Sequence, residues 1–193
     1  VYPIARGFGP LVTTIISILI LGLVLDNLII LSICLICLGI MILGIFNQPS
    51  KKNSKIIQYS LFTGFFIGLY SLVDGYGARV SLSAITYMSW SFILIAFLFP
   101  IVLKIKKQEN IFKNVMSRGK QIFWVGGTLS YIIYIIIVWG FTQAPIPMVG
   151  ALRETSIFFS IFIGYFFLKE KITSKKIFSI ILILVGVAGL KLF

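Results

Sequence analysis

Histidine is absent from the 193-residue sequence, and only five residues are acidic. The missing imidazole removes the commonest metal ligand and the commonest general base. The two cysteines, Cys34 and Cys37, lie inside an apolar run, where we expect them to pack on one helical face rather than form a disulfide or a redox pair. The sequence therefore predicts no metal site, no cofactor and no enzymatic activity.

Apolar residues are abundant instead. Hydrophobic residues make up 59% of the chain, charged residues only 11%, and the mean hydropathy is +1.09. A soluble globule of this size needs a large polar surface, so this composition predicts a protein whose solvent is the lipid bilayer. The formal net charge of +12 does not indicate a nucleic-acid partner, because no basic, solvated domain remains outside the apolar runs.

Seven apolar runs are each about long enough to cross roughly 30 Å of hydrocarbon. They lack the short alternating segments that β-barrel strands show. We therefore expect an all-α transmembrane fold with about seven membrane-spanning helices. The runs are Phe8–Leu25, Leu28–Phe46, Ile56–Val73, Ser83–Leu103, Gln121–Phe141, Met148–Leu168 and Ile177–Phe193.

Basic residues gather in three of the gaps between these runs, at 47–55, 104–120 and 169–176. The positive-inside rule then places these loops in the cytoplasm and the C-terminus outside. The 104–120 stretch is either a plain loop or an amphipathic helix on the membrane surface. The basic residues of the three gaps are Lys51, Lys52, Lys55, Lys104, Lys106, Lys107, Lys113, Arg118, Lys120, Lys169, Lys171, Lys175 and Lys176.

The sequence also matches itself at a spacing of 147 residues. The chain is expected to cross the membrane five times between the two copies, so the copies point in opposite directions. Inverted repeats of this kind are typical of secondary transporters. The aligned pairs include Arg6 with Arg153, Ser32 with Ser179, and Gly39 with Gly186.

The repeat predicts how the chain is organised. Residues 1–46 are expected to be the last two helices of a first five-helix repeat, and 47–55 a basic linker. Residues 56–193 are then a complete second repeat of five helices. On this interpretation the chain is the remainder of a ten-helix (5+5) fold whose first three helices precede the sequence.

Four segments carry a family resemblance. They are Val1–Gly7, Val73–Arg79, Ala151–Ser156, and Leu168–Lys171 followed by a helix that contains Gly186. In this order they resemble motifs of EamA-type permeases of the drug/metabolite transporter superfamily. The resemblance implies ten helices in two inverted halves, no use of ATP, and export or exchange of small metabolites. It also implies that both termini are cytoplasmic, opposite to the placement that the charges favour.

One departure from the family pattern lies at Gly22-Leu23, where the family often has a Gly-Glu pair.

Arg153 and Glu154 are the first candidates for a substrate-binding or gating site, because they open the sixth apolar run. A charge near hydrocarbon costs about 2.5–3.5 kcal/mol on insertion scales and usually faces the bundle interior. Arg153 is suited to bind an anionic group of a solute, and Glu154 is suited to take up a proton or to bind an amine. The alternative is that both anchor a helix end at the interface, where the helix dipole favours Glu154.

Asp74 and Arg79 are candidates in a predicted glycine-containing turn, where they either close the turn as an ion pair or contact the solute. Arg6, the repeat partner of Arg153, is equally well explained by extending to the membrane surface. A set of aromatic residues either lines a cavity or serves the interface and packing, and Trp90 and Tyr131 are the preferred cavity residues. The set is Tyr70, Tyr87, Trp90, Trp124, Tyr131, Tyr134 and Trp139.

The function predicted from these features is a secondary transporter that moves a small metabolite or amino-acid-like solute without ATP, since no nucleotide-binding G-x-x-x-x-G-K-[ST] motif occurs. The alternatives are a non-transporting membrane scaffold or inactive fragment, and a membrane-embedded lipid enzyme. The expected location is the cell membrane, in a bacterium the inner membrane. The expected partners are lipids and a small solute but no nucleic acid, and a homodimer is left open.

Overall fold

The computed structural model describes residues 2–46, 54–107, 111, 115, 117, 119–170 and 173–192. Its regular elements within this part of the chain are all helices, which confirms the predicted all-α fold. They are α1 (Tyr2–Leu19), α2 (Asn27–Phe46), α3 (Ser54–Val80), α4 (Ala84–Ile105), α6 (Lys120–Gln143), α7 (Ile146–Glu154), α8 (Ser156–Leu168) and α9 (Ser174–Lys191).

Within the described residues, six stretches are long and apolar enough to span a membrane. Five of them are α1, α2, α3, α4 and α6, and the sixth runs through α7 and α8 from Ile146 to Leu168. The seventh predicted run forms α9, which carries Lys175 and Lys176 at its start and Lys191 at its end. Lysines at helix ends can extend their ammonium groups to the interface, so this placement suits a membrane-spanning helix as well.

Two predicted helix boundaries are wrong. The first run was placed at 8–25, but α1 ends at Leu19 and Gly22 adopts a φ of 62°, a backbone conformation that glycine reaches without strain. The turn expected around Asp74 and Arg79 is absent, because α3 continues to Val80. Lipid offers backbone groups no hydrogen bonds, so a helix persists there through glycines that would favour a turn in water.

Several predicted loop residues lie outside the described part of the chain. They include most of the basic linker, at 47–53, together with Lys113, Arg118 and Lys171. Lys104 lies in the last turn of α4, and Lys120 begins α6.

The chain forms two compact units, and α3 contributes to both. Unit 1 comprises Val1–Val73 and Ala144–Phe193, and thus holds α1, α2, most of α3, α7, α8 and α9. Unit 2 comprises Asp74–Gln143, and holds the end of α3 with α4 and α6.

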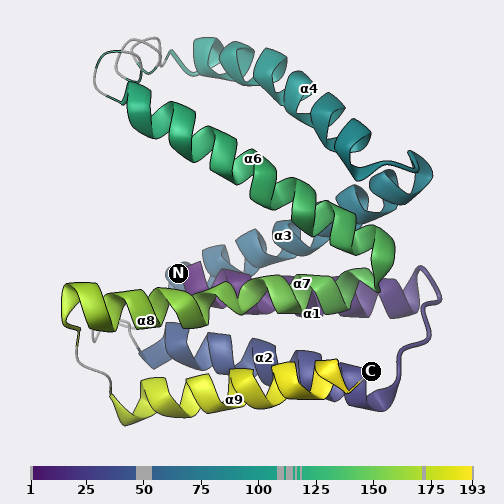
Figure 1. The fold of residues 1–193 in the computed structure, drawn as a ribbon, viewed down its shortest axis with the longest axis vertical. Coiled ribbons are helices and arrows are strands. Elements are labelled where there is room, and N and C mark those ends of the chain that lie inside the picture. The colour runs from purple at the N-terminus through teal and green to yellow at the C-terminus, as the bar shows by residue number, and fades with distance from the viewer. Residues whose placement is uncertain are drawn as a thin grey trace. The chain divides into compact units, whose positions relative to one another are not determined.

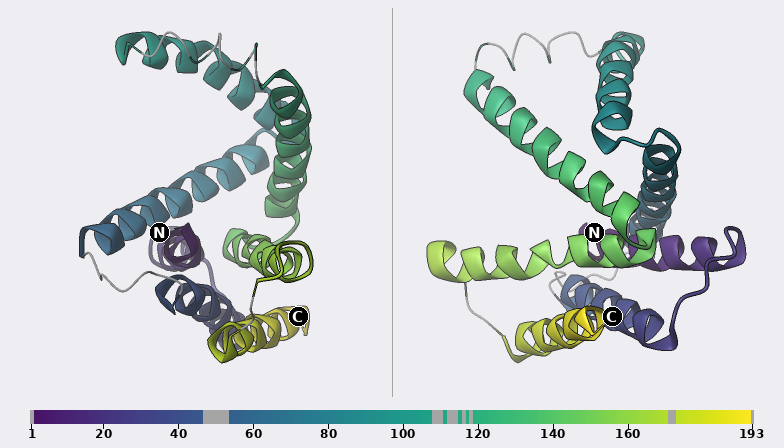
Figure 2. Two further views of the ribbon diagram at one scale, coloured as in Figure 1. Left: turned by 90° about the vertical axis from the view of Figure 1, so that its left-hand side faces the viewer. Right: turned by 45° about the vertical axis from the view of Figure 1, so that its right-hand side comes forward.

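Within unit 1 the repeat-related helices run in opposite directions. Figures 1 and 2 show α1 antiparallel to the line of α7 and α8, and α2 antiparallel to α9. The α2 and α9 helices lie side by side and supply much of the apolar core of the unit, including Ile33, Ile36, Ile40, Ile183 and Leu190. These directions are those expected of an inverted pair.

Two glycines, Gly39 on α2 and Gly186 on α9, bring these helices into close contact. A methyl group on Gly39 would lie 2.8 Å from a side-chain carbon of α9 and 2.9 Å from a carbonyl oxygen, and one on Gly186 would lie 2.7 Å from the equivalent atoms of α2. The residues so approached are Ser179 and Ile183 for Gly39, and Ser32 and Ile36 for Gly186. Each differs from its counterpart by 147 positions, so the contact is reciprocal, like that of a two-fold dimer.

The GxxxG pair Gly64 and Gly68, whose spacing favours close helix packing, does bring α3 against α1. A methyl group on Gly64 would lie 2.6 Å from the Ala5 carbonyl oxygen, and one on Gly68 would lie 2.8 Å from the Val12 side chain. The hydroxyl of Thr13 donates to the Gly68 carbonyl across the same contact, at 3.4 Å. The face of α1 that carries Thr13 therefore packs against the face of α3 that carries Gly64 and Gly68.

Candidate functional site

A break between α7 and α8 lies inside the span Ile146–Leu168. Helix α7 ends at Glu154 after nine residues, and α8 begins at Ser156. At the break the hydrogen bonds shorten to three-residue steps, from Thr155 N–H to the Leu152 carbonyl and from Phe158 N–H to the Thr155 carbonyl. Interrupted membrane helices of this kind often mark binding sites in transporters.

Helix α1 also lacks one backbone hydrogen bond, at the carbonyl of Arg6. Pro10 lies inside α1 and has no N–H, so the Arg6 carbonyl cannot receive its usual helical hydrogen bond. The hydroxyl of Thr14 donates to the Pro10 carbonyl at 2.7 Å. Because Arg6 aligns with Arg153 in the repeat, the two related helices are both irregular next to their arginine.

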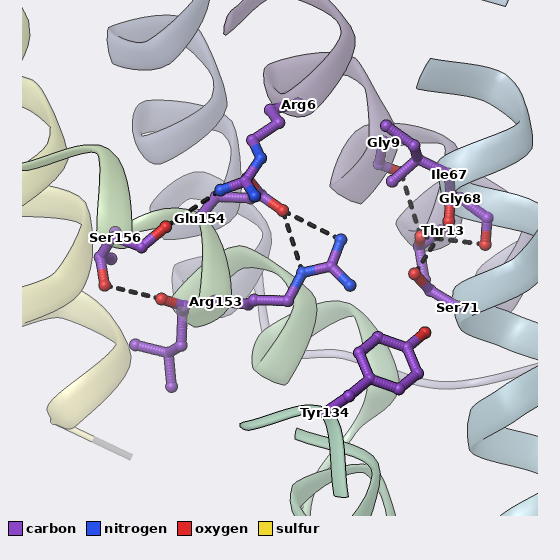
Figure 3. A network of polar contacts seen from close by, with 12 residues as sticks. Arg6, Gly9, Thr13, Ile67, Gly68, Ser71, Tyr134, Arg153, Glu154 and Ser156 are labelled. Atoms are coloured by element: carbon purple, nitrogen blue, oxygen red, sulfur yellow. Dashed lines mark hydrogen bonds and ion pairs between the residues drawn. The ribbon is translucent and has the colours of Figure 1, made fainter. Parts of the chain in front are cut away.

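The two arginines meet at one carboxylate. Glu154 is fully buried, and Arg153 binds its Oε1 through Nε at 3.1 Å and Nη2 at 3.0 Å. Arg6 reaches the other oxygen, Oε2, from α1 with Nη1 at 3.4 Å. Figure 3 shows the Glu154 carboxylate between the two guanidinium groups. We call these three residues the arginine–glutamate cluster.

Neighbouring side chains hold the guanidinium groups in place. Arg6 Nη1 donates to the Ser156 hydroxyl, in the first residue of α8, at 3.0 Å. The Arg6 guanidinium also lies 4.6 Å from the centre of the Tyr2 ring, and that of Arg153 lies 5.9 Å from the centre of the Tyr70 ring. Both distances are within the range of a cation–π contact. The cluster is therefore built by α1, α3, α7 and α8 together.

The cluster carries one more positive charge than negative. In the described part of unit 1, Glu170 pairs with Lys176 at 3.1 Å, and the remaining acidic residue, Asp26, follows the far end of α1. That end lies about 20 Å along the helix from Arg6, at 1.5 Å per residue. Within the described part of unit 1, the cluster thus contains two guanidinium groups and one carboxylate.

Asp74 is held in unit 2 by two phenols. The Tyr87 hydroxyl, from α4, donates to Oδ1 at 3.2 Å, and the Tyr134 hydroxyl, from α6, donates to Oδ2 at 2.6 Å. Gly77 lies one turn after Asp74 on α3, where a Cβ would collide with the Tyr87 ring. The glycine thus gives the phenol access to the carboxylate. Arg79 directs its Nε to the Phe141 carbonyl on α6, at 2.9 Å.

The two preferred aromatic candidates differ in their surroundings. The Tyr131 hydroxyl lies 2.8 Å from the Ser89 hydroxyl, and the Tyr131 ring packs edge-to-face on Phe92 with centroids 5.0 Å apart. Tyr131 therefore ties α6 to α4. Trp90 is 63% exposed.

Two open grooves lie on the surface of the described residues. One, of about 390 Å³, lies in unit 1 beside the ion pair of Glu170 and Lys176. The other, of about 380 Å³, lies in unit 2 between the start of α4 and the end of α6. Neither groove is lined by any of the six residues predicted for the site.

Sequence reasoning named Arg153, Glu154 and Asp74 but missed several of their partners. For Arg6, the sequence explains extension to the membrane surface equally well, and it gives no signal for Ser156. Tyr87 and Tyr134 were in the aromatic set but were not preferred. The signal that could have found Arg6 is its alignment with Arg153, since related positions of an inverted pair approach a common axis.

The described residues are mainly helical, and six of their stretches are candidate membrane spans. Two of these spans share one charged cluster. This is a multi-pass membrane protein. Residues 54–192 match the model of the EamA-like transporter family, and the chain belongs to this family. The match runs from the first residue of α3 to beyond the end of α9 and confirms the predicted resemblance. This is a family of transporters rather than of enzymes. No curated protein and no solved structure matches the chain.

Proposed function

We propose that this protein is a secondary transporter for small organic solutes that carry a negative charge, such as metabolites or amino-acid-like molecules with a carboxylate. It moves them across the cell membrane, in a bacterium the inner membrane, without ATP. The observation that carries the proposal is the arginine–glutamate cluster, in which Arg6 and Arg153 meet at the single buried carboxylate of Glu154.

The chemistry of the cluster favours a carboxylate. A guanidinium group presents a planar set of N–H donors that matches the two oxygens of a carboxylate. Glu154 neutralises one of the two guanidinium charges, and a solute anion would neutralise the other. An uncharged solute would leave the surplus charge in a low-dielectric site, which costs free energy.

The position of the cluster suits alternating access. Its two arginines come from α1 and α7, helices that are related by the repeat and run in opposite directions. A solute held by both would be in contact with both halves of the inverted pair while they rock around it. The irregular backbone beside each arginine gives each helix a place to bend.

The test is a solute counterflow assay with the full-length protein reconstituted in liposomes. The liposomes are preloaded with one of a panel of carboxylated metabolites. For any solute that exchanges, R153A and R6A are expected to lower the initial rate by roughly 10- to 100-fold, the loss of one hydrogen bond to a charged group. R153K keeps the charge but not the planar fork and should retain part of the rate.

The matched control is K176Q, which removes a cation that pairs with Glu170 away from the cluster. It is expected to keep the wild-type rate. Equal rates in K176Q, R153A and R6A would refute the cluster as the solute site. A correctly folded protein that exchanges only neutral or cationic solutes would refute the proposed substrate class.

A further inference from the structure

We infer that Asp74 is the residue that binds the coupling proton of this transporter. The inference rests on the proposed function for its role in transport, but it depends on a different unit and on a different set of contacts. It starts from the contrast between two carboxylates that both lie within candidate membrane spans, Asp74 in Lys55–Val80 and Glu154 in Ile146–Leu168.

Glu154 is neutralised by fixed charges. Two guanidinium groups bind its two oxygens, so a proton on this carboxyl would leave both arginines without their counter-ion. In a medium of low dielectric constant that state is strongly disfavoured. Binding of a proton to Glu154 would therefore break two ion pairs, whereas binding to Asp74 would break none that the described residues show.

Asp74 is held by neutral groups. Within the described residues, both of its hydrogen-bond donors are phenols, Tyr87 and Tyr134, and Asp74 takes part in none of the ion pairs found there. Phenols stabilise an anion without cancelling its charge. A carboxyl of this kind can lose its charge by binding a proton, because no partner cation is left uncompensated when it does.

Other charged groups on the helices around Asp74 lie elsewhere or are engaged. Arg79, on the same helix, points its Nε at the Phe141 carbonyl. Lys104 lies 17 residues after Tyr87 on α4, about 25 Å along the helix, and Lys120 lies 14 residues before Tyr134 on α6, about 21 Å away. The phenol of Tyr131 is bound to Ser89. Within unit 2, the described hydrogen-bond partners of Asp74 are thus its two phenols.

The distance from Tyr134 to Oδ2, 2.6 Å, is typical of a hydroxyl that donates to an ionised carboxylate. This geometry fits an Asp74 carboxylate that accepts from the Tyr134 hydroxyl. When a proton binds Oδ2, two hydrogens would point at each other, so either the phenol or the carboxyl must turn its O–H away. The charge-assisted bonds that tie α3 to α4 and α6 become ordinary or are lost. Proton binding would thus loosen the contact between these three helices.

The proton can be observed without knowledge of the solute. The complete protein is reconstituted in lipid, and infrared difference spectra are recorded as the pH is lowered. A carboxylic C=O band is expected to appear and to be missing in D74N. Y134F removes the shorter of the two hydrogen bonds to this carboxyl, so it should change the frequency of the band. Y87F should change it less, because its bond is longer.

Two controls separate Asp74 from the other carboxyls and from misfolding. E170Q removes an exposed carboxylate outside unit 2 and should leave the Asp74 band and its titration unchanged. Y134F changes a single hydroxyl, so an altered band in a protein that still elutes as a folded species reports the loss of that hydroxyl rather than misfolding. A band that persists in D74N, or one that has the same frequency in wild type, Y134F and Y87F, overturns the inference.

A transport measurement then tests the role in coupling. With a solute that supports counterflow, D74N is expected to retain exchange and to lose accumulation driven by a proton gradient. Loss of both, or retention of both, refutes coupling through Asp74. An infrared titration assigned to Asp74 in a protein without any flux would refute the transport proposal alone, and flux without that titration would refute only the present inference.

Discussion

Substitution of Gly39 or Gly186 by alanine tests the reciprocal contact between α2 and α9. Each added methyl group would lie 2.7–2.9 Å from a carbonyl oxygen and from a side-chain carbon of the facing helix. Carbon–oxygen contacts of this type normally measure about 3.3–3.6 Å. The helices would therefore have to separate by roughly 0.5 Å along their contact.

The expected cost follows from two opposing contributions. Overpacking a tight contact destabilises by about 1–3 kcal/mol, while alanine is favoured over glycine within a helix by roughly 0.8–1.0 kcal/mol. Each variant should thus lower the free energy of unfolding by about 0–2 kcal/mol. Because the first methyl group already separates the helices, the double variant should cost less than the sum of the two, by about 0.5 kcal/mol or more.

The measurement is reversible unfolding in mixed micelles, with G126A on α6 as the matched control. A methyl group on Gly126 meets nothing within 4 Å, so this variant reports helix preference alone and should be neutral or slightly stabilising. The informative quantity is the difference between each variant and G126A, which cancels that preference and should be about 1–3 kcal/mol.

Two outcomes would refute the reasoning. If G39A and G186A are as stable as G126A, the close contact does not exist in the folded protein. If one is costly and the other neutral, the contact is not reciprocal and the two-fold relation between α2 and α9 fails.

Three further predictions concern single contacts. E154Q leaves two half-buried guanidinium groups without a counter-ion, so the free energy of unfolding should fall by about 3–5 kcal/mol. A loss below about 1 kcal/mol in the same micelle assay would show that the cluster is solvated. Y131F removes the hydrogen bond to Ser89 but keeps the ring contact with Phe92, so it should cost only about 0.5–1.5 kcal/mol, clearly less than Y131A. G68V places two methyl groups against Val12 and the Gly9 carbonyl and should abolish disulfide trapping between cysteines introduced on facing positions of α1 and α3, whereas unchanged trapping would contradict the packing described for Gly68.

Much of the architecture could be predicted because lipid imposes simple rules on a sequence. Each apolar run is helical, the sixth as the two helices α7 and α8, since a membrane-spanning segment has to satisfy its own backbone. The 147-residue spacing was informative for a different reason: it identified positions that a two-fold relation brings together. Gly39 and Gly186 were aligned by the sequence, and each contacts the other's helix at matching residues.

The errors have an equally physical origin. The glycines beside Asp74 suggested a turn because glycine weakens helices in water, but α3 continues through them. The first helix begins earlier than its apolar run, since Arg6 is turned toward Glu154 and the start of α1 is packed within unit 1 rather than solvated. Hydropathy alone cannot detect a polar residue whose partner is on another helix.

The sequence predicted several residues of the candidate site but not the contacts between them. Neighbours in sequence point about 100° apart on a helix, so Arg153 and Glu154 were not expected to need each other, yet the long arginine side chain reaches back to the carboxylate. The pairing of Arg6 with Glu154 spans 148 positions, and no local pattern reports which faces of α1 and α7 meet. The same holds for the phenols of Asp74, which come from two other helices.

The reciprocal contact of α2 and α9 also constrains how the gene can diverge. A larger residue at position 39 or 186 would meet the side chain of the facing isoleucine and the backbone carbonyl of the facing serine, and only the isoleucine can shrink. Position 39 should therefore covary with 183, and position 186 with 36, among relatives.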